Sequence, residues 1–430
     1  MEVIMRWMAV ILILIGLLWA DWEIKVHDGS NIIFYLSNFG EFGQKPGDNP
    51  DLEWPKGSGN LHLFGGGIWF GALCPDTCVS QGYNPNSGRG ECVPGLVRQG
   101  TTAYHNPYVR VYIYPEDWPP PIDTFPMAPQ DPRTFEDSWC CFNESDPEFH
   151  DSLDTHPIGV EFYQSGYADP RCPDAVFLKY TIKNCTTKVL DNCLIGIVID
   201  PLRASAMRYI FNRWFLIGND SIYIDTLVFL SQFHPGQESL GMIGFYFLET
   251  PDQKGSLSCM RFTLEIDPSL DWQRYLMMKG IDYRTGDSIG FMPESSTPDE
   301  CRFTYCTGPF DLKPQEEKTF AFTICLGLDT LALIKMVDMA RDFYERYISV
   351  SEETRWFEQK LLIYPNPSRG LVNIIPTQDV EGVTIFDATG RLIHRLSPSP
   401  HLQLTLPPGI YFLKIKTKAG SIHQKILILK

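Results

Sequence analysis

The chain has 430 residues, of which 44% are hydrophobic and 20% charged, and it carries a formal charge of −16 at pH 7. These proportions are typical of a folded chain with a buried core, and the length fits two or three domains. The acidic balance repels phosphate backbones and therefore excludes nucleic acid as an expected partner.

The amino terminus has the pattern of a secretory signal peptide. Residues 7–20 are all apolar or small and follow Arg6, and Asp21 begins a more polar chain. A membrane-spanning helix needs about 20 apolar residues, so this shorter run predicts a signal peptide over residues 1–20 and no transmembrane segment after its cleavage. We therefore expect the protein to enter the periplasm.

Residues 21–350 are predicted to form a β-rich body of one unit or two subdomains. Their segment 48–133 holds much of the chain's proline and glycine and is expected to form long loops. This segment also contains aromatic residues that could stack on sugar rings. Aromatic side chains of β-proteins more often belong to the core, which is the alternative. The residues concerned are Trp54, Trp69, Trp118, Tyr112 and Tyr114.

All twelve cysteines lie between Cys74 and Cys325. An even count in a chain expected to cross the oxidising periplasm predicts disulfide bonds. Cys140 and Cys141 would point to opposite sides of a strand, so we expect them to pair with different partners. The disulfide candidates are Cys74, Cys78, Cys92, Cys140, Cys141, Cys172, Cys185, Cys193, Cys259, Cys301, Cys306 and Cys325.

A zinc site is the alternative interpretation of the first cysteines. Cys74, Cys78 and Cys92 could bind the metal together with His105. Structural zinc usually has two paired clusters of ligands, and this stretch has one. The sequence therefore favours disulfides over zinc here.

A cluster of acidic residues follows the adjacent cysteines. Asp146, Glu148, Asp151 and Asp154 could supply the oxygen ligands that calcium prefers. The regular Asp-x-Asp-x-Asp-Gly spacing is absent, and a solvated acidic loop is the alternative. Apart from the zinc alternative, calcium is the one cofactor that the sequence suggests.

The middle of the chain predicts strands. Apolar residues alternate with polar ones over 176–183, and a fully apolar run at 194–199 is the expected hairpin partner. Further strands are predicted at 221–230, 241–248, 259–266 and 318–326. A helix is predicted over 331–348 with Thr330 as its cap, followed by a linker at 351–360. The predicted fold class is mainly β: a β-sandwich body with one C-terminal helix.

A match to the serine-hydrolase motif occurs late in the body. Gly286, Ser288 and Gly290 fit the Gly-x-Ser-x-Gly pattern. A nucleophile elbow must lead from a strand into a helix, and Pro293 prevents a long helix there. Whether the protein is an enzyme stays open, and the absence of a convincing catalytic motif favours a role without catalysis.

The last seventy residues have the composition of a separate unit. Residues 361–430 lack cysteine and hold eight Lys/Arg against three Asp/Glu, a formal charge of +5. Because residues 1–20 are neutral, subtracting +5 from −16 leaves −21 for residues 21–360. Apolar residues alternate with polar ones over 402–406 and 411–416, and turn residues separate such runs, which predicts a small sandwich of short strands.

Three ordered blocks of this tail carry a resemblance. Tyr364-Pro365-Asn366-Pro367 opens the unit, and segments 383–391 and 406–415 follow as two predicted hairpins. The tail resembles the C-terminal sorting domain of the type IX secretion system. The residues that match are Tyr364, Pro365, Asn366, Pro367, Gly370, Asp387, Gly390, Arg391, Gly409 and Tyr411.

This resemblance implies a destination. Residues 361–430 would fold as a small Ig-like β-sandwich that the type IX secretion machinery in the outer membrane recognises. The protein would be secreted or held at the outer cell surface after passing through the periplasm, with attachment to a surface glycan or lipopolysaccharide as a further implied step. Segments 31–43, 54–60, 63–72 and 308–314 resemble uncharacterised exported proteins that carry the same tail, and no activity follows from that likeness.

The combined interpretation is an exported β-sandwich protein of structural, adhesive or binding type. The alternative is an exported hydrolase that acts on polysaccharide or protein. A hydrolase needs a nucleophile and a base, or two carboxylates, converging in an accessible site. A binding protein needs a suitable surface patch.

Overall fold

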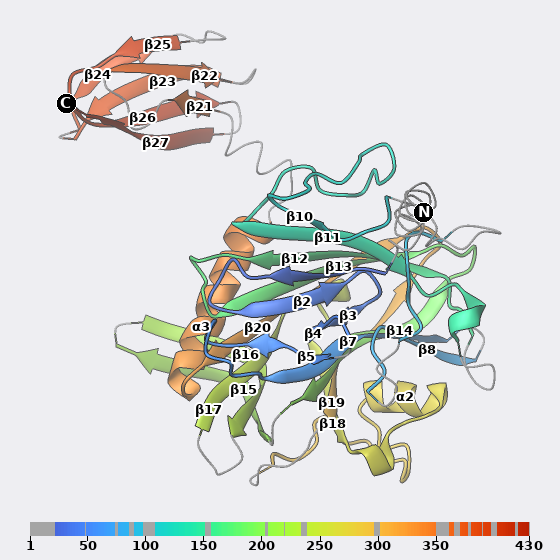
Figure 1. Cartoon of the computed structure of the whole chain (residues 1–430). Helices are drawn as coiled ribbons and strands as arrows, with labels where there is room; N and C mark the ends of the chain where they lie inside the picture. Colours follow the sequence, from blue (N-terminus) through green and yellow to red (C-terminus); the bar gives the residue numbers. More distant parts are fainter. Residues whose placement is uncertain are drawn as a thin grey trace, which may run out of the picture. The chain divides into compact units, whose positions relative to one another are not determined.

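The computed structural model describes residues 22–429 apart from several short segments. These are 48, 74–75, 86–89, 98–107, 151–155, 203–204, 219, 234–238, 296–301, 350–360, 365–369, 377–379, 389, 397–401 and 418–419. The predicted signal peptide therefore lies outside the described residues. The chain divides into two compact units, Met1–Ile348 and Ser349–Lys430, whose elements are labelled in Figure 1.

The body contains two large antiparallel sheets. The strands of the first are β1 (Ile24–His27), β2 (Ile33–Ser37), β3 (Glu41–Phe42), β6 (Leu52–Glu53), β7 (Leu63–Leu73), β8 (Thr77–Gln81), β14 (Leu190–Pro201), β18 (Ser256–Phe262) and β19 (Arg302–Leu312). Their order is β1-β2-β3-β7-β14-β19-β18, with β6 beside β2 and β8 beside β7. The short strands β4 (Gln44–Lys45) and β5 (Asn49–Pro50) pair with each other.

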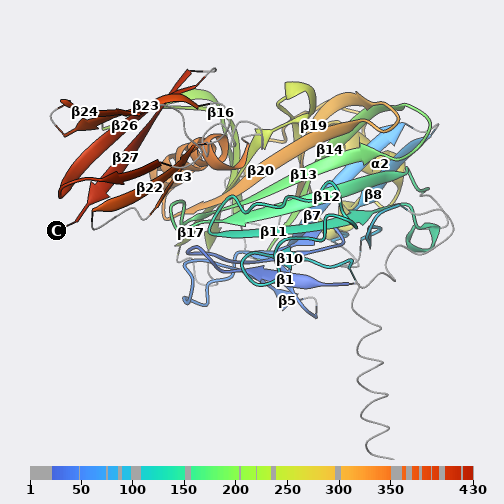
Figure 2. The same ribbon diagram turned by 90° about the horizontal axis from the view of Figure 1, so that it is seen from above.

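The second sheet is built from nine further strands. They are β9 (Val93–Pro94), β10 (Tyr112–Ile113), β11 (Glu136–Asn143), β12 (Val160–Ala168), β13 (Ala175–Asn184), β15 (Ser205–Ile217), β16 (Asp220–Phe233), β17 (Ser239–Glu249) and β20 (Glu317–Gly327). The order is β10-β11-β12-β13-β20-β17-β16-β15, with β9 beside β11. Figure 2 shows β11, β12, β13 and β20 running side by side.

The period of two along the strands explains why the sheets pack face to face. On β13, Val176, Leu178 and Tyr180 point into the core between the sheets, while Phe177 points to the outer face. Each strand thereby buries one row of side chains against the opposite sheet. The mainly β fold is confirmed, but the predicted hairpin between 176–183 and 194–199 is wrong. β13 pairs with β12 and β20, whereas β14 pairs with β7 and β19 of the opposite sheet.

Helices cover the outer faces of both sheets. Helix α2 (Asp271–Met278) packs on the first sheet through Tyr275 and Met278, which belong to one buried cluster with Trp69 and Leu194. Helix α3 (Thr330–Phe343) covers the second sheet and continues as one π-helical turn, η4 (Tyr344–Ile348). The described part of the body also contains the short 3-10 turns η1 (Pro147–Phe149), η2 (Pro251–Gln253) and η3 (Leu264–Ile266).

The start of α3 differs from the sequence prediction. Asp329, and not Thr330, is the cap: its carboxylate accepts a hydrogen bond of 2.8 Å from the backbone N–H of Ala332. Thr330 is already helical, and its hydroxyl contacts the sulfur of Met242 at 3.4 Å. Both residue types serve as caps, and the extended backbone of Asp329 decides between them.

The segment predicted to be rich in loops contains a central strand. β7 runs through Gly65, Gly66 and Gly67. A Cβ atom at Gly66 would lie 2.6 Å from Phe42, and one at Gly67 would lie 2.5 Å from Tyr83. The glycines therefore allow close packing of neighbouring chain segments within a sheet, rather than a turn.

The tail is a second, smaller sandwich. One sheet has the order β21-β22-β25 and the other β24-β23-β26-β27. The strands are β21 (Leu361–Tyr364), β22 (Leu371–Pro376), β23 (Val380–Asp387), β24 (Leu392–Leu396), β25 (Leu402–Thr405), β26 (Gly409–Thr417) and β27 (Gly420–Ile428). Leu404 of one sheet and Val383, Ile385 and Leu413 of the other form its core. In neither unit does a described helix have the length and apolar character needed to cross a membrane.

Candidate functional site

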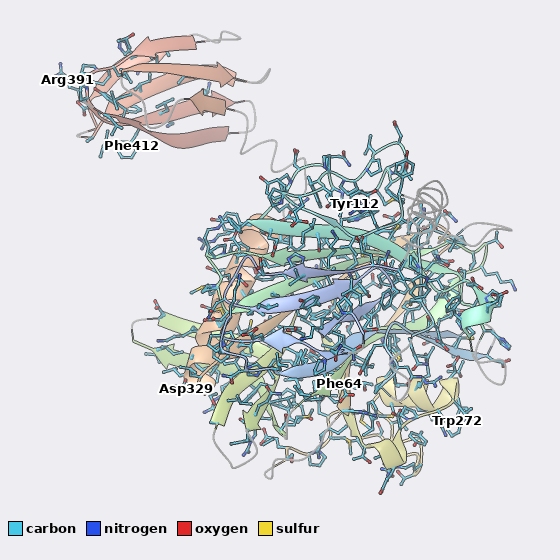
Figure 3. All side chains as sticks on the ribbon, in the orientation of Figure 1. Phe64, Tyr112, Trp272, Asp329, Arg391 and Phe412 are labelled. Atoms are coloured by element: carbon cyan, nitrogen blue, oxygen red, sulfur yellow. The ribbon has the colours of Figure 1, made fainter. Side chains whose placement is uncertain are left out.

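The outer face of the second sheet carries two separate apolar layers. Helix α3 packs over one half of this face, where Phe177 and Phe343 stack with ring centroids 5.5 Å apart. A loop that includes Val109 and Phe125 packs over the other half, against Trp139. Tyr112, labelled in Figure 3, belongs to this second layer, and Asp329 marks the start of α3 in the first.

Between these layers lies a row of mostly polar residues, which we call the polar strip. It consists of Ser165 on β12, Lys179 and Thr181 on β13, Thr319 and Ala321 on β20, and Glu249 on β17. Strand pairing places Lys179 opposite both Ser165 and Ala321, and it places Ala321 opposite Glu249. All of its members except the buried Ala321 are partly exposed.

The carboxylate of Glu249 is bound by a tyrosine from above the sheet. Tyr344 lies in η4, and its hydroxyl donates a hydrogen bond of 2.7 Å to Oε2 of Glu249. Burial, followed by the neighbouring Glu249 charge, raises the pKa of Tyr344, which keeps the phenol protonated. This hydrogen bond connects η4, the turn that follows α3, to the polar strip.

Lys179 occupies surroundings that oppose its positive charge. Burial, assisted by the charge of Arg133, lowers the pKa of the Lys179 amine, although Glu249 acts in the opposite direction. Arg133 is held by a hydrogen bond of 2.6 Å from Nη1 to the backbone oxygen of Ile348.

A second cluster contains a serine, a histidine and a carboxylate that follow one another as in a serine-hydrolase triad. His27 Nε2 lies 2.8 Å from Oγ of Ser138, and Nδ1 lies 3.1 Å from Oε2 of Glu136. His27 and Ser138 are each only 1% exposed. A Cβ atom at Gly166 would lie 2.7 Å from the Ser138 hydroxyl, so this glycine packs closely against it.

This cluster instead joins the two sheets. Glu136 on β11 accepts hydrogen bonds of 2.9 Å from the backbone N–H groups of Asp28 and Gly29, just after β1. Although burial by itself raises the pKa of Glu136, the hydrogen bond from His27 and these two N–H groups hold it below its usual value. The polar contacts thus satisfy groups that the sandwich buries near β1.

A third cluster lies on the outer face of the first sheet. Arg302 on β19 contacts Asp200 at 3.1 Å and Asp267 at 3.5 Å, and Tyr83 donates to Asp200 at 3.3 Å. Burial raises the pKa of Asp267 to about 6, against the opposing charges of Arg302 and Arg274. Two carboxylates therefore share one guanidinium in a mostly buried network.

The predicted calcium loop contains two described candidates. Asp146 accepts a hydrogen bond of 3.0 Å from the backbone N–H of Glu148 and so caps η1. Asp151 and Asp154 lie outside the described residues. Among the residues that the structure places, no group of three or more His, Cys, Asp or Glu is arranged to hold a metal ion. Calcium binding stays a prediction.

Glu144, next to this loop, has a role that the sequence did not indicate. Its buried carboxylate accepts hydrogen bonds from the backbone N–H groups of Ile158, Gly159 and Val160, at 2.7, 2.5 and 2.8 Å. Burial raises the pKa of Glu144, against the opposing influence of His150. The side chain therefore closes the base of the loop from residue 144 to residue 160.

The described cysteines lie mostly in the interior of the protein. Ten are described, of which nine are buried and Cys185 is partly exposed. Cys140 points into the core between the sheets and Cys141 into the outer apolar layer, as expected for neighbours on a strand. Cys74 and Cys301, like His105 of the zinc alternative, lie outside the described residues. Disulfide pairing stays a prediction.

The aromatic residues considered for sugar stacking mostly belong to the core. Trp54, Trp69 and Tyr112 are buried. Trp118 is partly buried and donates from its ring nitrogen to the backbone oxygen of Gln130 at 2.8 Å. These positions agree with the alternative that the aromatic side chains belong to the core.

Other large apolar residues are exposed instead, at the end of the β15–β16 hairpin. We define the hairpin end as Phe211, Trp214, Leu216 and Tyr223. Leu216 is 85% exposed, Trp214 66% and Phe211 45%. Trp214 and Tyr223 are cross-strand partners with rings 5.1 Å apart. Phe215 and Ile217, on the opposite face, pack against the α3 cluster, so this hairpin is apolar on both faces.

The sorting motif residues form turns of the tail sandwich. Asp387 and Arg391 close the turn between β23 and β24: the backbone N–H of Asp387 donates to the Arg391 oxygen at 2.9 Å, and the N–H of Arg391 donates to the Asp387 carboxylate at 3.0 Å. Gly390 has a φ of 82°, a conformation that favours glycine.

The remaining motif residues flank strands. Tyr364 ends β21, and Gly370, with a φ of 122°, precedes β22. Gly409 begins β26, and Tyr411 is buried with its hydroxyl donating to the backbone oxygen of Pro407 at 3.0 Å. Pro365, Asn366 and Pro367 lie outside the described residues.

Comparison with known families identifies this tail. Residues 362–429 match the family model of the secretion system C-terminal sorting domain. The resemblance found from the three sequence blocks is confirmed, and the tail indicates export through the type IX secretion system to the cell surface or extracellular space. A search of curated proteins finds no match.

Solved structures resemble the chain weakly. A polysaccharide lyase aligns with 95% of this chain and 46% of its own, at 8% identity and a TM-score of 0.28. A putative aldose 1-epimerase of Escherichia coli aligns with 72% of this chain and 100% of its own, at 10% identity and a TM-score of 0.29. A structural-genomics target from Synechocystis aligns with 72% of this chain and 96% of its own, at 9% identity and a TM-score of 0.31. The chain spans less than half of the lyase, and TM-scores this low carry no argument about function.

Proposed function

We propose that the protein is an exported binding or adhesive protein whose body contacts other surface components through the hairpin end. The sorting domain brings the body to the outside of the cell through the type IX secretion machinery. Attachment to a surface glycan or lipopolysaccharide, and disulfide formation during passage through the periplasm, belong to the same proposal.

The exposure of the hairpin end is the observation that supports adhesion. Single exposed apolar side chains are common on protein surfaces, but here Phe211, Trp214 and Leu216 occur together on one hairpin. β15 is also the last strand in the order of its sheet. Near its start, backbone groups of Met207 and Tyr209 bond with Ser295 and Glu294, and the hairpin end lies beyond these residues. An exposed apolar edge strand is a site for contact with other molecules.

The first prediction concerns this surface. Replacing Trp214 and Leu216 together by serine removes most of the apolar area of the hairpin end and should leave the fold intact, because both side chains are exposed. In a host with a type IX system, we expect the variant to be exported as well as the wild type but to shift from the cell-surface fraction to the medium. Immunoblots of the two fractions measure this shift.

Leu328→Ser is the matched control, because Leu328 is 73% exposed at the start of the α3 segment, outside the hairpin. It should behave as the wild type. Equal surface retention of the double variant and the wild type would contradict the adhesive role of the hairpin end, as would a wild type found entirely in the medium.

The alternative function, an exported hydrolase, has one observation in its favour. The distances among Ser138, His27 and Glu136 suit a nucleophile with its base, whereas the burial of Ser138 opposes reaction with a substrate. A fluorophosphonate probe distinguishes the two functions. Labelling of wild-type protein that disappears in Ser138→Ala would support the hydrolase.

A further inference from the structure

We infer that the tail sandwich docks on a membrane surface that carries anionic lipid headgroups, through the outer face of its four-stranded sheet. The strands of this sheet have the order β24-β23-β26-β27. We call its outer face the tail face and define it by two rows of residues, one apolar and one basic, that strand pairing places side by side. This surface belongs to the tail, so it goes beyond the adhesive function proposed for the hairpin end of the body.

The first row of the tail face is apolar. Leu392 on β24, Phe386 on β23 and Phe412 on β26 are register partners across three strands. Leu413 points into the core of the tail, so its neighbour Phe412 points outward, as does Ile410 two residues earlier. The exposed fractions are 44% for Leu392, 46% for Phe412 and 39% for Ile410. Three large apolar side chains are therefore exposed on one side of a small sheet.

The second row is basic and lies next to the first. Arg395 on β24, Thr384 on β23 and Lys414 on β26 are register partners, and both Arg395 and Lys414 are exposed. Residues two apart on a strand point to the same side, so Lys414 shares the outer face with Phe412. The pairing of β26 with β27 adds Lys425 at the position beside Phe412. Positive charge thus lies directly beside the exposed apolar row.

No acidic residue occupies either row of the tail face. The carboxylate of Asp387 accepts a hydrogen bond from the backbone N–H of Arg391, in the turn before β24. Glu381 lies at the register shift near the opposite end of β23. Arg391 and Phe412 are labelled at the same end of the tail in Figure 3. The formal charge of +5 on residues 361–430 therefore includes a basic row that no acidic position in it offsets.

Charge complementarity selects an anionic lipid surface as the occupant. At a membrane interface, apolar side chains insert between headgroups while lysine and arginine pair with lipid phosphates. A free phosphate would leave Phe412 and Ile410 without a partner, and an uncharged surface would leave Arg395 and Lys414 without one. The tail also indicates an export route that ends at the cell surface or beyond it, which brings it to the outer membrane.

The acidic body does not prevent this contact. The tail is a compact unit with a core of its own, separate from Met1–Ile348. At physiological salt, exposed charges separated by more than about 8 Å are largely screened from each other. The charges that face the headgroups therefore decide the electrostatic attraction, and in the tail face these are cations.

Vesicle binding by the exported protein, with residues 361–430 still attached, tests this inference. One set of vesicles contains phosphatidylcholine alone, and the other contains equal parts of phosphatidylcholine and phosphatidylglycerol. Co-sedimentation measures the affinity at low and high salt. We expect binding to the anionic vesicles that weakens as salt rises, and binding to the neutral vesicles that is about tenfold weaker or less. Inorganic phosphate at the concentration of the lipid phosphate should not displace the protein.

Two variants locate the contact. Replacing Arg395 and Lys414 together by glutamine should weaken binding to anionic vesicles about tenfold or more, because each cation near an anionic surface contributes about 1 kcal/mol. Phe412→Ser should also weaken binding but keep its dependence on salt. The matched controls lie on the exposed side of α3: Lys335→Gln and Leu331→Ser, where Leu331 is 47% exposed. Both controls should bind as the wild type does.

A labelling experiment on the wild type covers the case in which a tail variant does not fold. Acetylation followed by mass spectrometry should modify Lys414 in the free protein, and anionic vesicles should protect it while Lys335 stays reactive. The inference is overturned if neither vesicle binds the protein, if neutral vesicles bind equally well, if inorganic phosphate displaces it, or if Lys414 stays reactive in the bound state. Protection of Lys414 without vesicles, together with a dimer in light scattering, would instead make the tail face an interface between copies. These outcomes are separate from surface retention, which tests the hairpin end.

Discussion

Lys179, Asp267 and Glu144 fold into surroundings that oppose their charged forms. Burial lowers the pKa of Lys179 and raises the pKa of Asp267 and Glu144. At neutral pH such groups reduce the net stability of the body or stay uncharged. The stability of the body should therefore depend on pH in a direction that each residue sets.

Asp267 gives the clearest case. Its pKa is about 6 in the fold against 3.8 for an ordinary aspartate, so the native state binds the proton more tightly. The stabilisation from this group is fully present below about pH 4 and is lost as the pH rises through 6. We expect Asp267→Asn to raise the free energy of unfolding by about 1 kcal/mol at pH 8, allowing for solvent screening, and by nothing at pH 4. Urea unfolding at both pH values measures this.

The groups that face Asp267 come from three elements: Arg302 on β19, Arg274 on α2 and Asp200 on β14. Asp282→Asn is a control of opposite sign, because hydrogen bonds from the Arg284 guanidinium lower the pKa of Asp282. That variant should lose stability at pH 8 and approach the wild type at acid pH. A stability of Asp267→Asn that equals the wild type at every pH would contradict the raised pKa.

The sequence predicted the placement of some of these residues but not their surroundings. The period of two over 176–183 places Lys179 on the face opposite Leu178 and Tyr180. Glu249 and Tyr344 come to the same strip only through pairing of β13, β20 and β17 and through the π-helical turn after α3. Local patterns carry no information on which distant strands become neighbours.

At the scale of elements, α3 and the turn η4 after it show how closely a local sequence pattern predicts a helix. The sequence predicted a helix over 331–348, and the structure has α3 at Thr330–Phe343 followed by the turn Tyr344–Ile348. The buried face includes Leu333, Val337 and Ala340, with the spacing of an amphipathic helix. The pattern located the helix, while the cap differed by one residue.

This difference makes a testable pair of variants. Asp329→Ala removes the carboxylate that accepts from the Ala332 N–H and should lower the free energy of unfolding by about 1 kcal/mol. Thr330→Ala, at the residue that the sequence named as the cap, should change stability by less than about half as much, since its backbone is already helical. Chemical denaturation of both variants compares them. A larger loss of stability for Thr330→Ala than for Asp329→Ala would contradict the assignment of Asp329 as the cap.

The β15–β16 hairpin contains a strand that the sequence pattern does not predict. A strand was predicted at 221–230 and lies within β16, but β15 was not predicted. Around residues 209–217 apolar side chains occupy both faces, so no polar row marks the strand. The positive φ of Asn212, 43°, interrupts the pattern further. The strand exists because β16 pairs with it over its whole length.

At the scale of the molecule, the two units differ in charge and in sulfur chemistry. The tail carries +5 and no cysteine, whereas residues 21–360 carry −21 and all twelve cysteines. The tail also has its own buried core, formed within residues 383–428. Each unit therefore has the features of an independently folding domain.

Deletion of residues 361–430 tests this independence together with export. We expect the remaining body to stay folded, since its core contains no tail residue, and to accumulate in the periplasm, since the sorting domain is gone. Fractionation in a host with a type IX system and circular dichroism of the purified body measure the two outcomes. A truncated chain that reaches the medium as efficiently as the full-length protein would contradict the sorting role, and an unfolded body would contradict the independence.

The sequence by itself determined the mainly β class, the position of the helix near the end of the body, and the sorting domain of the tail. These features depend on residues close together in the sequence: the spacing of apolar residues, the turn residues and the short motifs. Only the tertiary structure decided that His27, Glu136 and Ser138 link the sheets, that Lys179 and Glu249 share one polar strip, and that the hairpin end is exposed. The reason is that such arrangements follow from pairing between strands far apart in the chain, and the burial and charge of each residue depend on those pairings.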